Sequence, residues 1–376
     1  IDQLAYHYTQ SDVTISAVRT KALTYLDAAA KRAKRDHANE TALAYFDRAL
    51  QFEHRWDWLM GRTEALHVLA RRMQEEANLW VLYHFGEASP AQQMETALHF
   101  ADFYEATGSF ESAAAWIGRA RKIALEVEDK RGEAGCLIKS GVIAWRQGDY
   151  AAATTAYQSA LTLAQANAAM SDIAAEAHYG LGLVYRQLSR YDDANSQFEI
   201  DLELNRHLGN RYGEARDLNA LGAIADLQRD FHKASQLFQE ALKIRETIGD
   251  RAGMAISMLS QAQAYGYMGD YSKEEPLLQR ALAMQRAISS TWDEMLTLNE
   301  FGILFTIVGD YTKAFSHLEQ ALQRSESIGS EIGAAYILCN LGQAQRDSGQ
   351  LADAAQTFER GLRLAHGQGD TNLEAI

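Results

Sequence analysis

The residues of this 376-residue chain that could do chemistry form no recognisable catalytic motif. A phosphate-binding loop needs Gly-x-x-x-x-Gly-Lys-Ser/Thr, and the chain does not contain even a Gly-Lys pair. Gly180-Leu181-Gly182 is only a fragment of a dinucleotide fingerprint, because the third glycine and a preceding strand are missing. The Gly-x-Ser-x-Gly element of serine hydrolases is also missing from the sequence. We therefore predict no catalytic residue, no cofactor and no enzymatic activity.

Residues that could bind a metal ion are equally scattered. The eleven histidines include no His-Glu-x-x-His pair and no Cys/His cluster with zinc spacing. His99 and Asp102 are three residues apart and share one face of a helix. That spacing favours a surface hydrogen bond over a metal site, so we predict no metal centre.

The elements that must position any other site follow from an internal repeat. A three-residue landmark recurs seven times. It consists of a turn-forming residue, a second turn or polar residue, and a bulky apolar residue. Consecutive landmarks are 40 or 41 residues apart. They begin at Gly108, Gly148, Ser189, Arg229, Gly269, Gly309 and Gly349.

Other positions keep the same phase. Seven residues before each landmark is glycine or alanine, and nine residues after it is a bulky side chain. Five residues after it is alanine except at Glu274, and twelve after it is a small residue except at Asp201. Two antiparallel helices per repeat explain this pattern, because small residues allow helix backbones to cross closely and large ones fill the gaps between them.

Turn chemistry predicts where these helices begin and end. A landmark glycine ends the first helix in the left-handed conformation. Ser272 and Glu275 have the spacing of a capping box. The aspartates that follow landmark residues are placed to cap the second helix, and they are Asp149, Asp230, Asp270 and Asp310.

The succession of small, aromatic, glycine, aromatic, alanine and bulky positions resembles the tetratricopeptide repeat. It is similar to the long 40-residue subclass of spindle-orientation adaptors and kinesin light chains, with a Gly-Asp turn in place of the usual proline. The resemblance implies an all-α fold, a right-handed superhelix of antiparallel helix pairs. We expect about seven regular repeats over residues 94–376, truncated at the start of a further repeat, and degenerate helix pairs over residues 1–93.

The two ends of the chain point to a larger protein. We expect helices over about 13–33 and from Ala38, then a pair over 59–85, with Pro90 at the break before the regular array. The run from Leu4 to Tyr8, followed by the alanines, Tyr25 and Leu26 of 22–30 and then by Asn39-Glu40, resembles the region that follows the nucleotide-binding module in bacterial signal-transduction ATPases of the STAND class. Residues 370–375 restart a helix without a polar cap, so we expect the parent chain to continue or this end to dock, for example on a second copy.

The tetratricopeptide resemblance also implies a concave groove lined by the first helix of each repeat. Asparagine and glutamine recur near one phase of these helices despite their helix propensity cost, as they do where side chains bond an extended peptide backbone. The alternatives are that these side chains are solvated or bond to the neighbouring repeat, and that the aromatic ones are packing residues. The expected groove residues are Trp145, Tyr179, Arg186, Arg216, Asn219, Asp226, Gln263, Asn299, Tyr336, Asn340, Gln343 and Arg346.

Composition narrows the choice of partner and compartment. The net charge is −14, and the acidic excess belongs to residues 57–376, which makes nucleic acid a poor partner. No apolar run is long enough to span a membrane, and no signal peptide is visible. Cys136 and Cys339 are the only cysteines, and a solenoid separates them too widely for a disulfide, which favours a cytoplasmic location.

The sequence thus predicts a binding protein. We expect the sensor or scaffold region of a bacterial signalling protein, which recognises a peptide, a protein or a small inducer in its groove. The alternatives are a stand-alone adaptor that assembles protein complexes and an arm for homo-oligomerisation.

Overall fold

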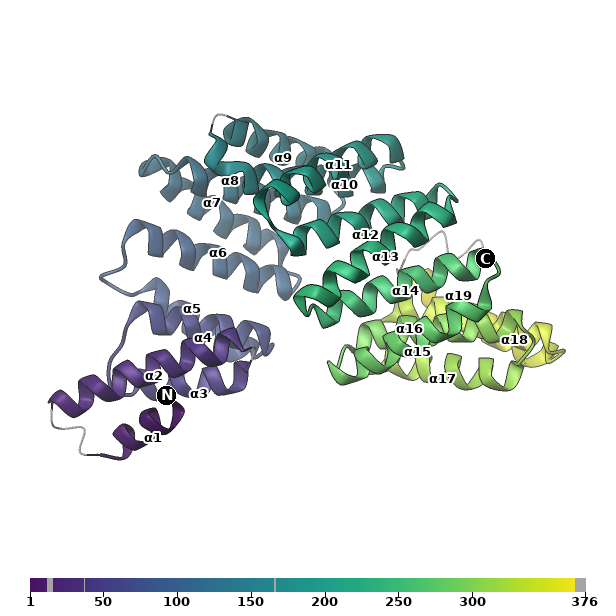
Figure 1. Ribbon diagram of the computed structural model, residues 1–376, viewed down its shortest axis with the longest axis horizontal. Coiled ribbons are helices and arrows are strands. Elements are labelled where there is room, and N and C mark those ends of the chain that lie inside the picture. Colours follow the sequence, from purple (N-terminus) through teal and green to yellow (C-terminus); the bar gives the residue numbers. More distant parts are fainter. Residues whose placement is uncertain (12–15, 37, 166, 369–376) are drawn as a thin grey trace. The chain divides into compact units, whose positions relative to one another are not determined.

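The computed structural model describes residues 1–11, 16–36, 38–165 and 167–368, and these form nineteen α-helices and one short 3₁₀ helix, without a strand (Figure 1). The predicted all-α class is therefore confirmed. The predicted helix at 370–375 lies outside the described residues. By its internal contacts the chain divides into two compact units, Ile1–Val184 and Tyr185–Ile376, which we call unit 1 and unit 2.

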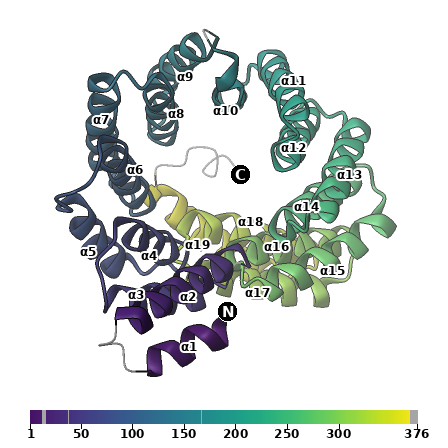
Figure 2. The ribbon, with the colours of Figure 1, turned by 60° about the vertical axis from the view of Figure 1, so that its left-hand side comes forward.

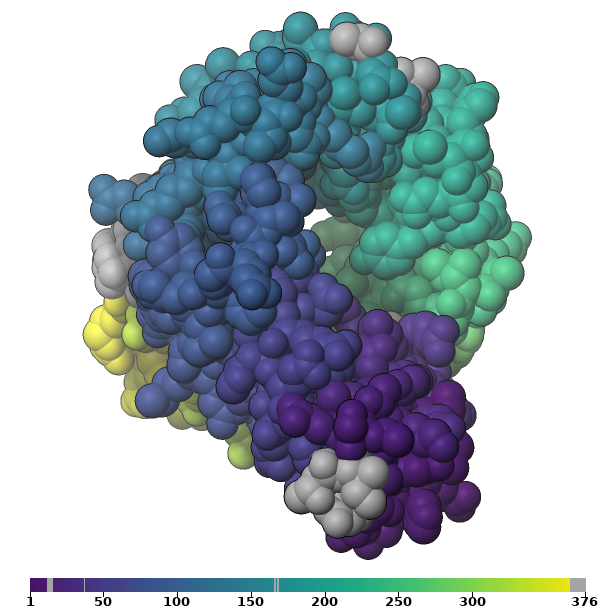
Figure 3. Space-filling model, turned by 90° about the vertical axis from the view of Figure 1, so that its left-hand side faces the viewer, coloured from purple at the N-terminus to yellow at the C-terminus, as the bar shows by residue number. Residues whose placement is uncertain are grey.

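Unit 1 begins with the irregular helix pairs. The predicted helices at about 13–33 and from Ala38 correspond to α2 and α3, and the pair over 59–85 corresponds to α4 and α5. Pro90 is the first residue of α6, where Ser89 and Gln92 form a capping box. Figure 3 shows the packed surface of these helices from purple to blue. The helices are α1 Asp2–Gln10, α2 Ser16–Arg35, α3 Asn39–Leu50, α4 Trp56–Val68, α5 Arg72–Tyr83, α6 Pro90–Ala106, α7 Phe110–Glu126, α8 Lys130–Arg146, α9 Tyr150–Gln165, η1 Ala168–Met170 and α10 Ser171–Gln187, whose last three residues belong to unit 2.

Unit 2 is built from regular pairs. Each first helix packs along the second helix of its own pair, as in α12 with α13, and the second helix packs in turn against the first helix of the next pair, as in α13 with α14. The first helices of unit 2 lie on one side and the second helices on the other (Figure 2). The helices are α11 Tyr191–Leu208, α12 Arg211–Leu227, α13 Phe231–Ile248, α14 Arg251–Tyr267, α15 Tyr271–Ala287, α16 Thr291–Ile307, α17 Tyr311–Ser327, α18 Glu331–Asp347 and α19 Leu351–Gln368.

The alternation of small and bulky positions fills the interior of each pair. The ring of Phe238 lies so close to Gly222 that a Cβ on this glycine would approach the ring to 2.6 Å. Gly342 meets Phe358 and Gly302 meets Leu318 in the same way. These contacts confirm that small residues admit the bulky residue of the facing helix, as close packing requires.

The turns follow the predicted chemistry with one correction. The landmark glycines have positive φ, from +73° at Gly269 to +87° at Gly349, and Ser189 and Arg229 take the same conformation where glycine is replaced. Side chains of Asp149, Asp230 and Asp310 accept the capping hydrogen bonds from backbone N–H groups.

The predicted capping box of Ser272 and Glu275 is wrong. The hydroxyl of Ser272 donates to the carboxylate of Asp270, and Glu275 accepts from Gln279 on its own helix. Asp270 itself makes no side-chain cap, because its carboxylate is bound by Ser272 and Lys273 instead.

Candidate functional site

The first helices of unit 2 form a continuous surface, which we call the first-helix face and define by α12, α14, α16 and α18. α12 contacts α14, α14 contacts α16, and α16 contacts α18. The second helices α13, α15 and α17 have no comparable contact with one another in the described part of the chain. Because the first helices are closer together, unit 2 curves toward the first-helix face.

Side-chain amides link neighbouring first helices on this face. The hydroxyl of Ser257 donates to Oδ1 of Asn219 at 2.6 Å, and Nε2 of Gln263 donates to Glu300 at 2.8 Å. Nδ2 of Asn340 donates to Oδ1 of Asn299 at 2.8 Å. Each bond joins one repeat to the next, so these four predicted groove residues do bond to neighbouring repeats. Their role toward a ligand stays a prediction.

Arg216 has a partner inside the protein. Its Nη2 lies 3.0 Å from Asp201, a fully buried carboxyl that stands where other repeats have a small residue. Asn205 donates to both Asp201 and Asp217, which is fully buried as well. Burial raises the pKa of Asp201, and the neighbouring Asp217 carboxyl raises it further. Arg216 therefore acts as the counter-ion of a buried acid pair.

Three carboxyl groups near α14 have no such counter-ion among the described residues. They are Asp226 on α12, Glu274 on α15 and Glu300 on α16. Burial and, after it, the charge of Glu300 raise the pKa of Glu274 to about 7. Burial also raises the pKa of Glu300 and of Asp226, and the charge of Asp226 adds to the rise at Glu300. Sequence reasoning noted Asp226 and the irregularity at Glu274 but missed Glu300.

The remaining predicted groove residues are divided between the units. In unit 1, Trp145 and Tyr179 are half-buried, and Nε1 of Trp145 is buried without a hydrogen-bond partner in the described residues. Arg186, in unit 2, is half-buried. Tyr336, Gln343 and Arg346 are exposed on α18, where Arg346 pairs with the adjacent Asp347 at 2.9 Å. The structure therefore gathers only part of the predicted set on one continuous face.

The first helices of unit 1 carry paired charges instead. Lys139 on α8 binds Asp102 on α6, and Arg146 lies 2.9 Å from Glu105. Asp102 thus bonds to a lysine rather than to His99. Among the described residues no group of three or more histidine, cysteine or acidic side chains could hold a metal ion.

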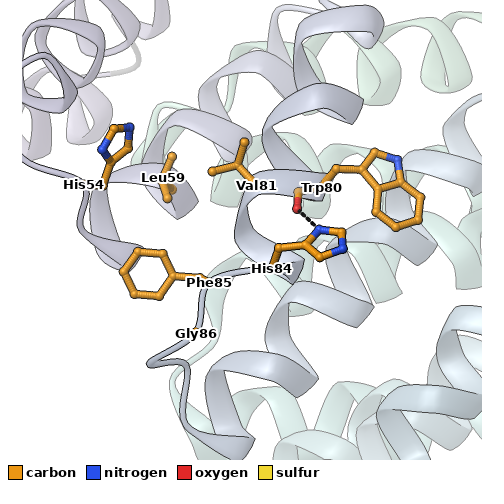
Figure 4. Close-up of a pocket in the computed structure, with 7 residues that line it drawn as sticks. All are labelled: His54, Leu59, Trp80, Val81, His84, Phe85 and Gly86. Atoms are coloured by element: carbon orange, nitrogen blue, oxygen red, sulfur yellow. Dashed lines mark hydrogen bonds between the residues drawn. The ribbon is translucent and has the colours of Figure 1, made fainter.

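A pocket that sequence reasoning missed lies at the end of α5 (Figure 4). Trp80 is 39% exposed and its ring packs edge-on against Phe100 at 5.0 Å. Nδ1 of His84 donates to the carbonyl oxygen of Trp80 at 2.8 Å. Only the density of aromatic residues around Trp80 signals this pocket in the sequence. Its lining residues are His54, Leu59, Trp80, Val81, His84, Phe85 and Gly86.

Two further properties bear on the setting of these sites. Among the described helices, none is both long and apolar enough to cross a bilayer. Both cysteines are free, with Cys136 buried and Cys339 half-buried.

Comparisons with known proteins agree with the helical pairs. Residues 173–247 and 293–365 match a family model described as tetratricopeptide repeat, and residues 134–167 match a second model of the same description. No curated protein matches the chain in sequence.

Solved structures share the fold at low sequence identity. A Rap protein complexed with Competence and Sporulation Factor has a TM-score of 0.61 at 14% identity, covering 93% of this chain and 99% of that chain. The Rap conjugation gene regulator of plasmid pLS20, in complex with the Phr* peptide, has 0.60 at 14%, covering 93% and 96%. Aspartyl phosphate phosphatase F from Bacillus subtilis has 0.61 at 13%, covering 89% and 91%. The three matched stretches of this chain are therefore tetratricopeptide repeats within an all-helical array.

Proposed function

We propose that this chain is a non-catalytic scaffold that binds an extended peptide or protein segment on the first-helix face. The observation that carries the proposal is the bond between Asn340 and Asn299. It uses the Nδ2 donor of Asn340 and the Oδ1 acceptor of Asn299. This bond does not use the Oδ1 acceptor of Asn340 or the two N–H donors on Nδ2 of Asn299.

These remaining groups suit a peptide backbone. Both asparagines are half-buried, and neither remaining atom is among the buried polar atoms that lack a partner in the described residues. A neighbouring donor and acceptor can pair with one N–H and one C=O of an extended chain. Two structures of similar fold contain bound factors or peptides according to their descriptions, which supports this ligand class.

A selection of random peptides displayed on phage against the whole chain tests the proposal. We expect enriched peptides whose binding, measured by calorimetry, falls at least ~10-fold in an Asn299→Ala, Asn340→Ala double variant. Asn195→Ala is the matched control, because Asn195 is also half-buried but lies on the second helix α11, where it pairs with Glu199. Enriched peptides that bind wild type and the double variant equally would contradict the proposal.

A finer proposal concerns the setting of this scaffold. We infer that it is the sensing part of a bacterial signal-transduction ATPase, and the N-terminal sequence resemblance supports this. The first two segments that carry this resemblance lie in α1 and α2. These helices pack together, and the ring of Tyr8 stacks on the ring of Tyr25 with 5.4 Å between the ring centroids. A nucleotide-binding module encoded in frame upstream of Ile1 is the expected finding. A gene without one would leave the stand-alone adaptor as the better account.

A further inference from the structure

Glu274 breaks the repeat pattern at a buried position. The equivalent residue in the other six landmarks is alanine, as in Ala234 and Ala314, and these alanines are fully buried. Glu274 is only 4% exposed, so its side chain is buried as well. A carboxyl group in such a position normally has a charged or hydrogen-bonding partner.

A second exception makes room for this carboxyl. A Cβ built on Gly266 of α14 would lie 2.9 Å from Oε2 of Glu274, so the missing side chain leaves the space that the carboxyl occupies. Gly266 stands three residues before its landmark, and no other repeat has glycine there. The equivalent residues are Glu105, Trp145, Arg186, Asp226, Thr306 and Arg346.

The carboxyl of Glu274 lacks the partner that its burial calls for. Its Oε2 is buried and accepts no hydrogen bond from any residue that the structure describes. Oδ1 of Asp226 is in the same situation. Glu300 accepts one bond, from the neutral amide of Gln263. The three acids thus repel one another across α14, with Glu300 acting on Glu274 and Asp226 acting on Glu300.

The charged groups nearby do not neutralise these acids. Lys273 binds Asp270 and lies over the ring of Tyr265 at 5.0 Å. Burial raises the pKa of the Tyr267 phenol, the charges of Glu300 and Asp226 raise it further, and Arg229 lowers it. No ion pair joins Arg229 to any of the three carboxyls in the described part of the chain.

Elsewhere the same chain supplies a cation to such acids. Asp201 is the other acidic exception of the repeat, and Arg216 contacts it at 3.0 Å. In unit 1, Lys139 and Arg146 serve Asp102 and Glu105. The set of Asp226, Glu274 and Glu300 is the contrast, and it lies on and directly beneath the first-helix face.

We propose that this set receives the guanidinium group of an arginine in the bound peptide, an assignment that rests on the proposed function and names its ligand class. Guanidinium is the best fit because it has five donors in a planar fork, which can serve carboxylates that approach from several helices. A single metal ion fits less well, because the acidic side chains of the described residues form no group that could hold one. Glu300 and Asp226 are half-buried and make the contact, and Glu274 supplies negative charge from below.

The test compares an acetylated and amidated Ala-Ala-Arg-Ala-Ala peptide with the same peptide containing citrulline, the uncharged isostere of arginine. A third peptide has lysine at the centre. We expect the arginine peptide to bind at least ~10-fold more tightly than the citrulline peptide, with lysine between them. Equal binding of the arginine and citrulline peptides, or no binding of either, overturns the inference.

Three variants test this inference, and a fourth separates it from the proposed function. Glu300→Gln and Glu274→Ala should remove the preference for arginine over citrulline, and the latter restores the residue of the other repeats. Glu246→Gln is the control, because Glu246 is exposed on the second helix α13 and pairs with Arg280. If instead the Asn299→Ala, Asn340→Ala variant leaves binding of both peptides intact, the proposed function fails independently of the arginine preference.

Proton release on binding provides a test that needs no variant, so that misfolding of a variant cannot affect its outcome. Guanidinium binding favours the ionised carboxyls, so the arginine peptide should release protons near about pH 7 and the citrulline peptide should not. Calorimetry in two buffers of different ionisation enthalpy measures this release. Absence of the difference also overturns the inference.

Discussion

The ring of Tyr157 packs between Gly141 of α8 and Gly180 of α10, so that a Cβ on Gly141 would lie 2.6 Å from Cε1 of the ring. Tyr157 is 3% exposed and has little room to move. Gly180-Leu181-Gly182, which resembles a fragment of a nucleotide-binding loop in the sequence, is thus part of a helix that receives an aromatic side chain.

This contact predicts opposite effects for two glycines of the same helix. Gly141→Ala should lower the free energy of unfolding by about 1–2 kcal/mol, because overpacking against Tyr157 outweighs the gain in helix propensity. Gly135→Ala is the matched control, since a Cβ there meets nothing within 4 Å, and it should raise stability by up to about 1 kcal/mol. Urea unfolding followed by circular dichroism measures both. A neutral or stabilising Gly141→Ala would contradict the packing argument.

Arg216 should matter more for stability than an ordinary surface arginine. Arg216→Gln leaves Asp201 and Asp217 buried without their cation and should cost about 3 kcal/mol. The double variant with Asp201→Ala, which restores the small residue of other repeats, should recover much of that loss. Additive effects of the two substitutions in a double-mutant cycle would show that the residues are not coupled.

Glu274 makes stability depend on pH in a definite direction. Its pKa in the folded chain is about 7, above its ordinary value of 4.5, so the folded state holds a proton that the unfolded state releases between these values. The contribution of Glu274 to the free energy of unfolding is therefore fully present below about pH 4.5 and is lost as the pH rises through about 7.

Replacing Glu274 removes this loss. Glu274→Ala should be more stable than wild type by about 2 kcal/mol at about pH 8, and the advantage should shrink by about pH 5. Thermal unfolding over this pH range measures the difference. A constant difference between the two proteins would mean that Glu274 titrates normally.

The two cysteines should differ in reactivity. Burial raises the pKa of Cys136 to about 11. Cys339 is only half-buried, and its pKa is raised by burial while Arg346 opposes the rise. Titration of native protein with a chromogenic disulfide should therefore modify Cys339 first. In a Cys339→Ser variant the remaining thiol should react only as the protein unfolds, and prompt reaction of that variant would contradict the burial of Cys136.

The sequence predicts the architecture well because the repeat multiplies weak signals. The same turn recurs seven times, with glycine at positions such as Gly269 and Gly309, and these recurrences together predict where the helices end. The left-handed conformation of Ser189 and Arg229 is known only from the structure. Competition between hydrogen-bond acceptors within one turn is harder to predict from the sequence. Ser272 has the spacing of a capping box, but the carboxylate of Asp270 accepts its hydroxyl instead.

The candidate site is less predictable for a related reason. Whether the side chain of Asn340 faces solvent or contacts Asn299 depends on the angle between two neighbouring repeats. The sequence of either helix alone does not determine this angle. Glu300 looks like any polar residue of an exposed helix face. Its neighbours Asp226 and Glu274 come from two other helices, so its environment exists only after three repeats have packed.

The nearest-neighbour contacts of unit 2 have a mechanical consequence. Because α12, α14, α16 and α18 make their main contacts with one another in succession in the described part of unit 2, small rotations at successive junctions add up along the array. A segment that holds Asp226, Glu274 and Glu300 at once would straddle the junctions on both sides of α14 and clamp their angles together. Binding of such a segment would then change the stiffness of unit 2.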